Sequence, residues 1–167
     1  VGIVINNAAI QHPRPLTDPA FDPADAIDEA NVNLVAPTLI AHATLATLLA
    51  TDRPTAIVNI GSGLAFHPKR DTGLYCASKA ALHSLSQSLR YQLEGTSVRV
   101  IEAILPLVDT PMTAGRGTGK IGADAAARAI LAGMAKGRDE IFIGKARLLR
   151  VLDAVVPAIP RKVLKGS

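Results

Sequence analysis

The composition describes a protein with a packed core. The chain has 167 residues, of which 49% are hydrophobic and 19% are charged, which excludes a disordered polar chain and predicts one domain. Aromatic residues make up only 3%, so few rings are available for stacking on bases, and no nucleic-acid partner is expected. The core must be built from Ala, Val, Ile and Leu, as in buried parallel strands covered by helices.

The net charge of +4 is distributed unevenly along the chain. The residues from Lys145 onward contain six Lys or Arg and one Asp, a net charge of +5, whereas the first 144 residues carry −1. We therefore divide the chain into a domain over residues 1–144 and a basic amphipathic tail over residues 145–167. The tail is either a solvated helix face or a segment in weak contact with a membrane surface.

The first predicted elements are a buried strand and a long helix. Residues 1–5 form a continuous apolar run, which is typical of a strand inside a parallel sheet. Asp22 and Pro23 mark the start of the helix, because the acid can cap free backbone N–H groups and proline fits the first turn. We expect this helix to continue to about Ala50 with a bend near Pro37. Its second half is nearly free of charge, but proline, histidine and threonines there favour a packed helix over a membrane span.

The rest of the chain alternates strands and helices. The second long helix has leucines at helical spacing and ends at Gly95, since glycine readily adopts the left-handed conformation of a helix end. Such alternation indicates parallel strands joined by crossover helices, an α/β fold with an open sheet between helix layers. We expect strands at residues 56–60, 98–104 and 140–143, helices at 74–94 and 122–136, and a glycine-rich loop at 105–120.

The most informative residues are Tyr75 and Lys79, which lie about one turn apart on one face of a predicted helix. An ammonium group beside a phenol stabilises the phenolate and lowers its pKa, so the pair could exchange a proton with a substrate oxygen. Ser62 lies at the predicted carboxyl end of a strand, where ligands bind in open α/β sheets. Singly, these residues are an ordinary surface pair and a turn serine; together, they predict a site of proton transfer.

In this order and at these separations the residues resemble the short-chain dehydrogenase/reductase family. Residues 6–9, Asn-Asn-Ala-Ala, are similar to the family's Asn-Asn-Ala-Gly turn. Asn33, in Asn-Val-Asn-Leu-Val, matches the family's catalytic asparagine, although a satisfied buried amide is the alternative. Residues 105–110 take the place of the family's Pro-Gly-x-Val-x-Thr stretch and retain its valine and threonine as Val108 and Thr110.

The resemblance implies an oxidoreductase that interconverts an alcohol and a carbonyl of a small molecule by hydride transfer, with NAD or NADP as cofactor. Tyr75 would be the general acid or base, and Lys79 would lower its pKa and hold the cofactor ribose. Ser62 would bind the carbonyl oxygen, and Asn33 would hold a water next to Lys79. The implied cofactor contacts are Asn6, through its side chain, Ala8, Tyr75, Lys79, Val108 and Thr110.

The resemblance covers a partial Rossmann-like fold, a doubly wound parallel sheet in three α/β/α layers that lacks the first βαβ units. A glycine-rich phosphate-binding turn after a strand is absent from the sequence, and we expect it to precede Val1. Residues 1–5 should then form an exposed apolar edge. Two hypotheses follow: a fragment of a normal enzyme, or a cofactor-free, inactive interaction module. In both, the family implies a homo-oligomer through the helices near residues 34–50 and 74–94.

Other kinds of site find little support in the sequence. The four histidines have no metal-ligand spacing, so no metal site is expected. Ser62, His67 and Asp71 do not form a hydrolase triad, because Ile60 replaces the first glycine of Gly-x-Ser-x-Gly. Cys76 is interpreted as a packing residue, and a single cysteine agrees with a reducing, cytoplasmic location. An anionic substrate group could be recognised by basic residues of the loops, namely Arg14, Lys69, Arg70, Arg116 and Lys120.

Overall fold

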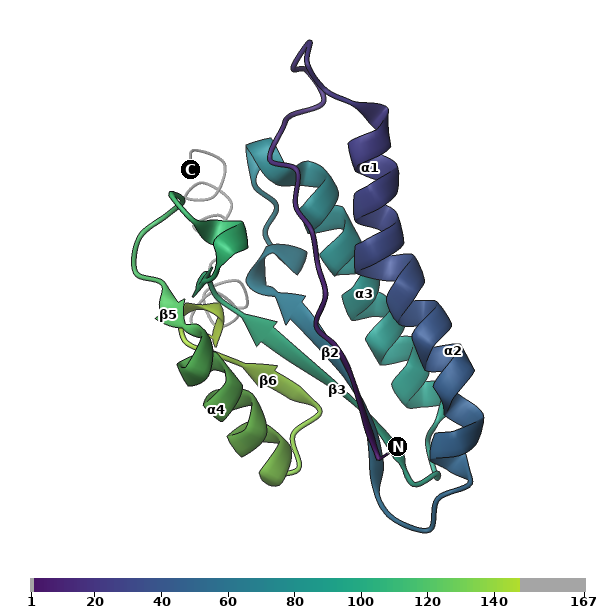
Figure 1. Ribbon diagram of the computed structural model, residues 1–167. Helices are drawn as coiled ribbons and strands as arrows, with labels where there is room; N and C mark the ends of the chain where they lie inside the picture. Colours follow the sequence, from purple (N-terminus) through teal and green to yellow (C-terminus); the bar gives the residue numbers. More distant parts are fainter. Residues whose placement is uncertain (1, 148–167) are drawn as a thin grey trace.

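A four-stranded parallel sheet forms the centre of the molecule in the computed structural model, which describes residues 2–147. The strand order is β1-β2-β3-β6, with every neighbouring pair parallel (Figure 1). This arrangement confirms the predicted α/β fold. The predicted tail lies outside the described residues beyond residue 147, so its division from the domain stays a prediction. The strands are Ile3–Asn6 (β1), Thr55–Ser62 (β2), Val98–Leu105 (β3) and Glu140–Phe142 (β6).

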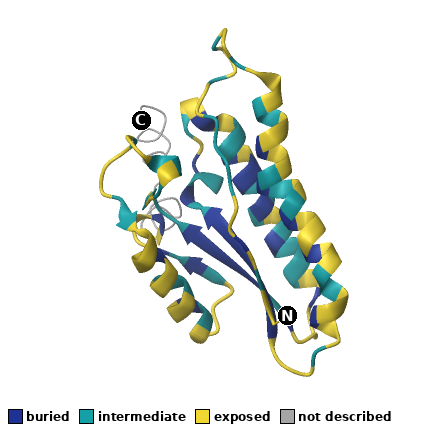
Figure 2. Ribbon diagram, in the orientation of Figure 1, coloured by how far each residue is buried: buried dark blue, intermediate teal, exposed yellow. Residues whose placement is uncertain are grey.

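Helices cover both faces of the sheet and complete the predicted three layers. On one face lie α1 (Pro23–Ala30), α2 (Ala36–Leu49) and α3 (Gly73–Gln92), and on the other lies α4 (Ala123–Ala135) (Figure 1). Figure 2 shows that the buried residues concentrate on the strands and on the helix surfaces that face them. The layers are therefore held together by apolar packing against the sheet.

Two apolar clusters result from the alternation of side chains along the strands. Ile57 packs with Leu48 and Val100 in the cluster beneath α2 and α3. The next residue, Val58, packs with Ile101 in the cluster beneath α4. Because both faces of β2 are buried, this strand is a continuous apolar run rather than an alternating one.

The long N-terminal helix contains one irregular turn. Its start follows the prediction, since the Asp22 side chain accepts a hydrogen bond of 2.8 Å from the Ala24 backbone N–H. Between α1 and α2, residues Asn31–Val35 form a π-helical turn (η1) immediately before Pro37, which has no backbone N–H to continue an α-helical ladder. The expected irregularity near Pro37 is thus an expanded turn, and it contains Asn33.

The helical run Pro23–Leu49 combines a packed face with a large apolar surface. By length and composition alone it could cross a membrane, and 22% of its most apolar window is buried in the molecule. Ala41 and Leu48 pack against the sheet. The outer surface of α2 retains exposed large apolar side chains, namely Leu39, Ile40 and Leu49. Figure 2 colours much of this helix as exposed.

The segment between β3 and α4 is more ordered than the predicted loop over residues 105–120. Val108–Asp109 (β4) and Ile121–Gly122 (β5) pair as a two-stranded parallel sheet. A short 3-10 turn, Pro111–Thr113, follows β4, and the Thr113 hydroxyl donates to the Val108 carbonyl at 2.6 Å. Strands of two residues carry too little periodicity to be recognised in a sequence.

Strand β1 forms an edge of the described sheet, as expected. It pairs with β2, and its Ile3 and Ile5 side chains are 51% and 55% exposed. These isoleucines share a register with Ala56 and Val58, which belong to the cluster beneath α4. Their exposure means that α4 does not extend over β1 within residues 2–147.

The packing of α2 gives a direct test of the fold. Leu48 is 0% exposed, so Leu48→Ala should lower the free energy of unfolding by about 3 kcal/mol through lost burial and the cavity left behind. Leu131 on α4 is 62% exposed, and Leu131→Ala should change it by less than about 0.5 kcal/mol. Urea denaturation followed by circular dichroism measures both values, and equal losses would contradict the assigned packing.

Candidate active site

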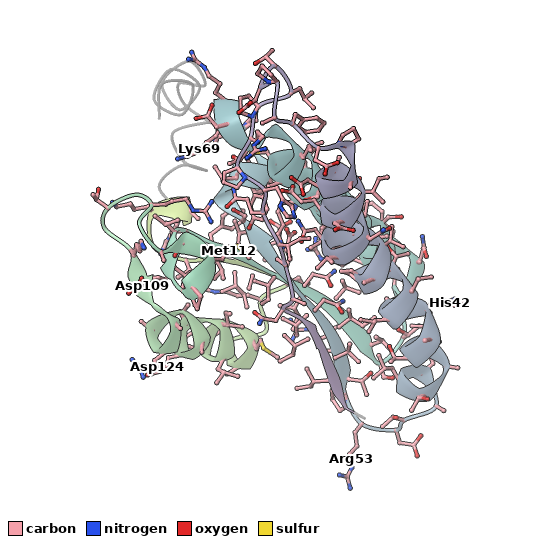
Figure 3. All side chains as sticks on the ribbon, turned by 45° about the horizontal axis from the view of Figure 1, so that its top comes forward. His42, Arg53, Lys69, Asp109, Met112 and Asp124 are labelled. Atoms are coloured by element: carbon pink, nitrogen blue, oxygen red, sulfur yellow. The ribbon has the colours of Figure 1, made fainter. Side chains whose placement is uncertain are left out.

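Three of the predicted site residues converge on one cavity at the carboxyl ends of β2 and β3. The cavity has a volume of about 750 Å³, and its lining includes Ser62, Tyr75 and Lys79. Ser62 ends β2, whereas the other two lie on α3. The loops after β3 and before α3 contribute further walls, and Figure 3 labels one lining residue from each, Met112 and Lys69.

Lys79 is the buried cation of the site. Only 3% of the residue is exposed, and its Nζ donates a 2.9 Å hydrogen bond to the backbone carbonyl of Ile60 on β2. Nζ also lies 5.7 Å from the centre of the Tyr75 ring. Burial lowers the pKa of Lys79 to about 8, while the negative charge of Glu102 acts in the opposite direction. The lysine can therefore change its charge near neutral pH.

Burial determines the acidity of the Tyr75 phenol. It raises the pKa of the phenol to about 12, and the Ser62 side chain and the charge of Arg116 oppose this rise. Desolvation therefore outweighs these two opposing effects. Lys79 Nζ donates to the Ile60 carbonyl and lies over the Tyr75 ring, and the lowering of the Tyr75 pKa by Lys79 stays a prediction.

Ser62 is positioned by the end of β2 and the turn that follows. Its backbone is extended, and its hydroxyl accepts a 3.2 Å hydrogen bond from the Leu64 backbone N–H, which begins a short 3-10 turn. The same hydroxyl acts on Tyr75, whose phenol pKa it lowers against the effect of burial. A serine held in this way at the cavity wall can orient an oxygen atom that approaches the phenol.

Asn33 lies behind the cavity rather than in its lining. The residue is fully buried, and its amide clamps the backbone of Ile10, with Oδ1 accepting from the N–H and Nδ2 donating to the carbonyl, both at 2.9 Å. Nδ2 also donates to the Ser78 hydroxyl at 3.1 Å, one residue before Lys79. Asn33 therefore joins the loop after β1 to α3. The water-holding role implied for it stays a prediction.

The side chain of Asn6 does not line the cavity, which corrects its expected placement. Its Nδ2 donates to Asn59 Oδ1 at 2.7 Å, and Asn59 in turn donates to the Ser86 hydroxyl at 2.8 Å. The two asparagines are register partners on β1 and β2, so their side chains point to the same face, toward α3. The lining instead contains the next residues, 7–9, which include Ala8.

The remaining predicted contacts, Val108 and Thr110, line the cavity from the segment after β3. Arg116, one of the basic loop residues named from the sequence, also lines this cavity, and its Nη1 donates to Gln11 Oε1 at 2.7 Å. One feature was not predicted. Glu102 is a buried acid in β3, and its signal was an acidic residue inside an apolar strand. Roles for the site residues toward a cofactor stay predictions.

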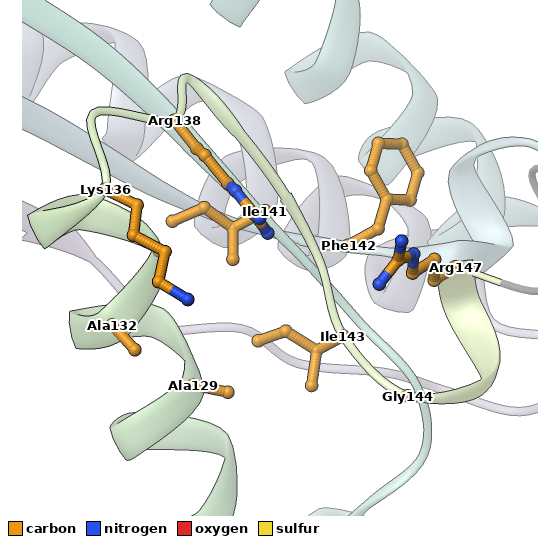
Figure 4. A pocket seen from close by; sticks show the side chains of 10 residues that line it. Ala129, Ala132, Lys136, Arg138, Ile141, Phe142, Ile143, Gly144 and Arg147 are labelled. Carbon is orange, nitrogen blue, oxygen red and sulfur yellow. The ribbon is translucent and has the colours of Figure 1, made fainter.

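A second hollow lies between α4 and the segment that follows β6 (Figure 4). It has a volume of about 470 Å³ and is lined by small and apolar residues together with Lys136, Arg138 and Arg147. None of its lining residues belongs to the larger cavity or to the predicted site. We therefore assign the active site to the larger cavity.

The family assignment is supported by both sequence and structure. The family model described as short chain dehydrogenase matches residues 1–120. The uncharacterized oxidoreductase DltE of Bacillus subtilis is 42% identical over 113 residues, which are 66% of this chain and 43% of DltE. Sulfoacetaldehyde reductase 2 of Chromohalobacter salexigens is 33% identical over 114 residues, 68% of this chain and 44% of that protein.

A solved structure agrees over nearly the whole chain. The crystal structure of a short chain dehydrogenase from Burkholderia cenocepacia J2315 in complex with NADP has a TM-score of 0.87 and 29% sequence identity. The match covers 98% of this chain and 68% of that one. The chain spans about half the length of the relatives that its sequence matches. With the motif residues gathered at one cavity of the expected fold, the chain belongs to the short-chain dehydrogenase family.

Proposed function

We propose that the protein carrying this chain is an NAD(P)-dependent oxidoreductase that interconverts an alcohol and a carbonyl. The observation that carries this proposal is the convergence of Ser62, Tyr75 and Lys79 on one cavity. A cofactor-free interaction module would not need a buried cation and a half-buried phenol at the wall of such a cavity. Bound NADP in the related Burkholderia structure supports the choice of cofactor.

The cavity fits a nicotinamide cofactor beside a small substrate. Residues 7–9, which follow β1, and Val108 and Thr110, which follow β3, line the cavity. The cavity therefore lies beyond the carboxyl ends of the strands, where open α/β sheets bind ligands. A bound nicotinamide supplies or accepts the hydride. Lys79, whose ammonium lies at the same wall, can hold hydroxyl groups of the ribose by donating hydrogen bonds.

The proton steps belong to the chain's own residues. In carbonyl reduction, the Tyr75 hydroxyl gives its proton to the substrate oxygen, and in alcohol oxidation the phenolate takes it back. Ser62 donates a hydrogen bond to the same oxygen and fixes its position next to the phenol. A phenol with a pKa of about 12 is a weak acid and stays protonated at neutral pH, so we propose that the positive charges of Lys79 and Arg116 stabilise the phenolate during turnover.

The acid–base role of Tyr75 can be tested by removing one oxygen atom. Tyr75→Phe should lower kcat by about 10²- to 10⁴-fold, because the proton donor is lost while the ring and its packing remain. Steady-state assays of reduced-nicotinamide absorbance measure this change in the complete protein, and cofactor titration should show largely unchanged binding. Tyr91→Phe, at a residue that is 76% exposed on the same helix, serves as the matched control and should retain full activity. Unchanged turnover in Tyr75→Phe would refute the assignment.

We also propose that the substrate carries an anionic group near the reacting carbon. Of the five basic loop residues named from the sequence, Lys69 and Arg116 line the cavity. Lys120 is instead held by Asp109 and the Thr113 carbonyl. The name of the related sulfoacetaldehyde reductase, whose substrate is a sulfonate, supports this choice. Arg116 is the stronger candidate, because its charge acts on the Tyr75 phenol.

Paired substrates would test this selectivity. Arg116→Met should lower kcat/KM for sulfoacetaldehyde by about 10- to 100-fold, the loss expected for a charged hydrogen bond, and for the neutral propanal by much less. Arg70→Met removes a nearby loop cation that does not line the cavity, and both substrates should retain their rates. Equal losses for the two aldehydes in Arg116→Met would contradict anion recognition.

A second copy of the protein is the partner that we propose for the outer face of α2. Leu39 is 60% exposed, Ile40 and Leu49 are each 43% exposed, and no Asp, Glu, Lys or Arg lies within this helix. An apolar face of this kind can meet its own copy across a twofold axis. The position agrees with the helices from which the sequence predicts a homo-oligomer.

Charge on this face should separate the copies. Leu39→Glu places a carboxylate where apolar burial is proposed, so the protein should dissociate to monomers in sedimentation velocity experiments. Leu131→Glu on the exposed face of α4 is the control and should keep the parent's assembly state. A monomeric parent protein, or a Leu39→Glu variant that remains oligomeric, would refute the proposed interface.

A further inference from the structure

The proposed function assigns no role to the buried acid Glu102. The contacts of its carboxylate indicate such a role. It lies in the middle of β3 with no exposed surface, on a strand whose neighbouring residues Val100 and Ile104 are also buried. Moving a carboxylate out of water is costly unless donors and cations surround it, and an apolar residue would pack here without that cost. The acid therefore calls for an explanation beyond packing.

One carboxylate oxygen of Glu102 is held by residues of α3. Its Oε2 lies 2.6 Å from His83 Nδ1 and 3.9 Å from Arg90 Nη2. Arg90 is itself fixed by the Val100 carbonyl, to which its Nε donates at 3.0 Å, and by Glu140 Oε1 at 3.3 Å. The carboxylate is thus held by one hydrogen bond from His83 and by the charge of a guanidinium that is itself fixed in place.

The other oxygen of Glu102 lies against the backbone of the catalytic strand. Oε1 is buried without a hydrogen-bond partner among the described residues, and a Cβ on Gly61 would lie only 2.5 Å from it. A side chain at position 61 would therefore displace the Glu102 carboxylate from its present place. Gly61 stands between Ile60, whose carbonyl accepts the Lys79 hydrogen bond, and Ser62. Oε1 of Glu102 therefore lies against β2 at Gly61, between Ile60 and Ser62.

The charges around Glu102 come from two elements. Lys79, His83 and Arg90 lie on α3, and Glu140 lies on β6. The negative charge of Glu102 raises the pKa of Lys79 against the effect of burial. Its hydrogen bond likewise raises the pKa of His83. The carboxylate is thus electrostatically coupled to the catalytic lysine as well as to its own partners.

The same cluster does not require a metal ion. His83, Glu102 and Glu140 offer ligand atoms that lie within 4.8 Å of one another. Arg90 already places its guanidinium within 3.9 Å of Glu102 and 3.3 Å of Glu140. The protein therefore supplies the positive charge that the two carboxylates need.

We propose that Glu102 is a positioning residue for Lys79: its carboxylate, anchored by His83 and Arg90, keeps the buried ammonium charged and in place at the Ile60 carbonyl. This inference rests on the proposed function, in which the lysine charge stabilises the Tyr75 phenolate. Glu102 itself does not line the cavity and touches no substrate. Its loss should weaken proton transfer and leave substrate binding intact.

The direct test is the titration of Lys79 by NMR, with lysine labelled at ¹³Cε and the signal assigned by its loss in Lys79→Arg. Glu102→Gln keeps the side-chain shape and removes the charge, so the midpoint of the Lys79 titration should fall by about one pH unit. Glu102→Asp retains the charge, and the fall should be less than half as large. Glu140→Gln, which removes the acid beyond Arg90, is the matched control and should shift the midpoint less than Glu102→Gln does.

Each result decides the proposal. A Lys79 midpoint that stays unchanged in Glu102→Gln, or that falls equally in the Gln and Asp variants, assigns Glu102 to packing alone and overturns it. If circular dichroism shows that Glu102→Gln does not fold, the Lys79 titration of Glu102→Asp decides the proposal. A fall of its midpoint by a few tenths of a pH unit supports the proposal, and an unchanged midpoint overturns it.

Kinetics separate this inference from the proposed function. In the complete protein, Glu102→Gln should lower kcat by about 2-fold at pH 7 and by nearly 10-fold at pH 9 with KM nearly unchanged, and Glu102→Asp should restore most of the rate. If the parent protein turns over neither alcohols nor carbonyls with NAD or NADP, the proposed function fails. The Lys79 titration still answers the electrostatic question in that case, because it needs no turnover.

Discussion

The hydrogen bond between Lys79 Nζ and the Ile60 carbonyl is the constraint around which the site is built. It joins α3 to β2 and holds the ammonium at the wall that also carries Ser62 and Tyr75. An ammonium buried to this extent needs both an acceptor and a nearby negative charge. The Ile60 carbonyl provides the first, and the carboxylate of Glu102 on the neighbouring strand β3 provides the second.

Polar contacts behind the cavity hold its elements at fixed distances. A chain of buried amides and hydroxyls joins Asn6, Asn59 and Ser86 across β1, β2 and α3. Asn33 ties the loop after β1 to α3 in the same way. Such networks add specificity because every member must keep its partner in a dry interior. Residues in the loops that line the cavity do not have to keep buried polar partners. We therefore expect these loops to determine which substrate binds.

The fold was predictable because its signals are local and repeated. Apolar runs, the acid and proline that begin α1, and Gly95 after α3 all reflect rules that act within a few residues. The site was partly predictable, since the spacing of Tyr75 and Lys79 places them on one helix face. The orientation of the Asn6 side chain and the raised pKa of Tyr75 depend on residues far away in the chain, so neighbouring positions could not reveal them.

The sequence by itself determined which groups are present and on which elements they lie: a phenol and an ammonium one turn apart, a serine at a strand end, and an acid within an apolar strand. Only the tertiary structure decided how these groups act on one another. Burial dominates the pKa of Tyr75, and Glu102 reaches Gly61 across the sheet. The reason is that desolvation and charge coupling depend on distances in space, which are set when α3 packs onto β2 and β3.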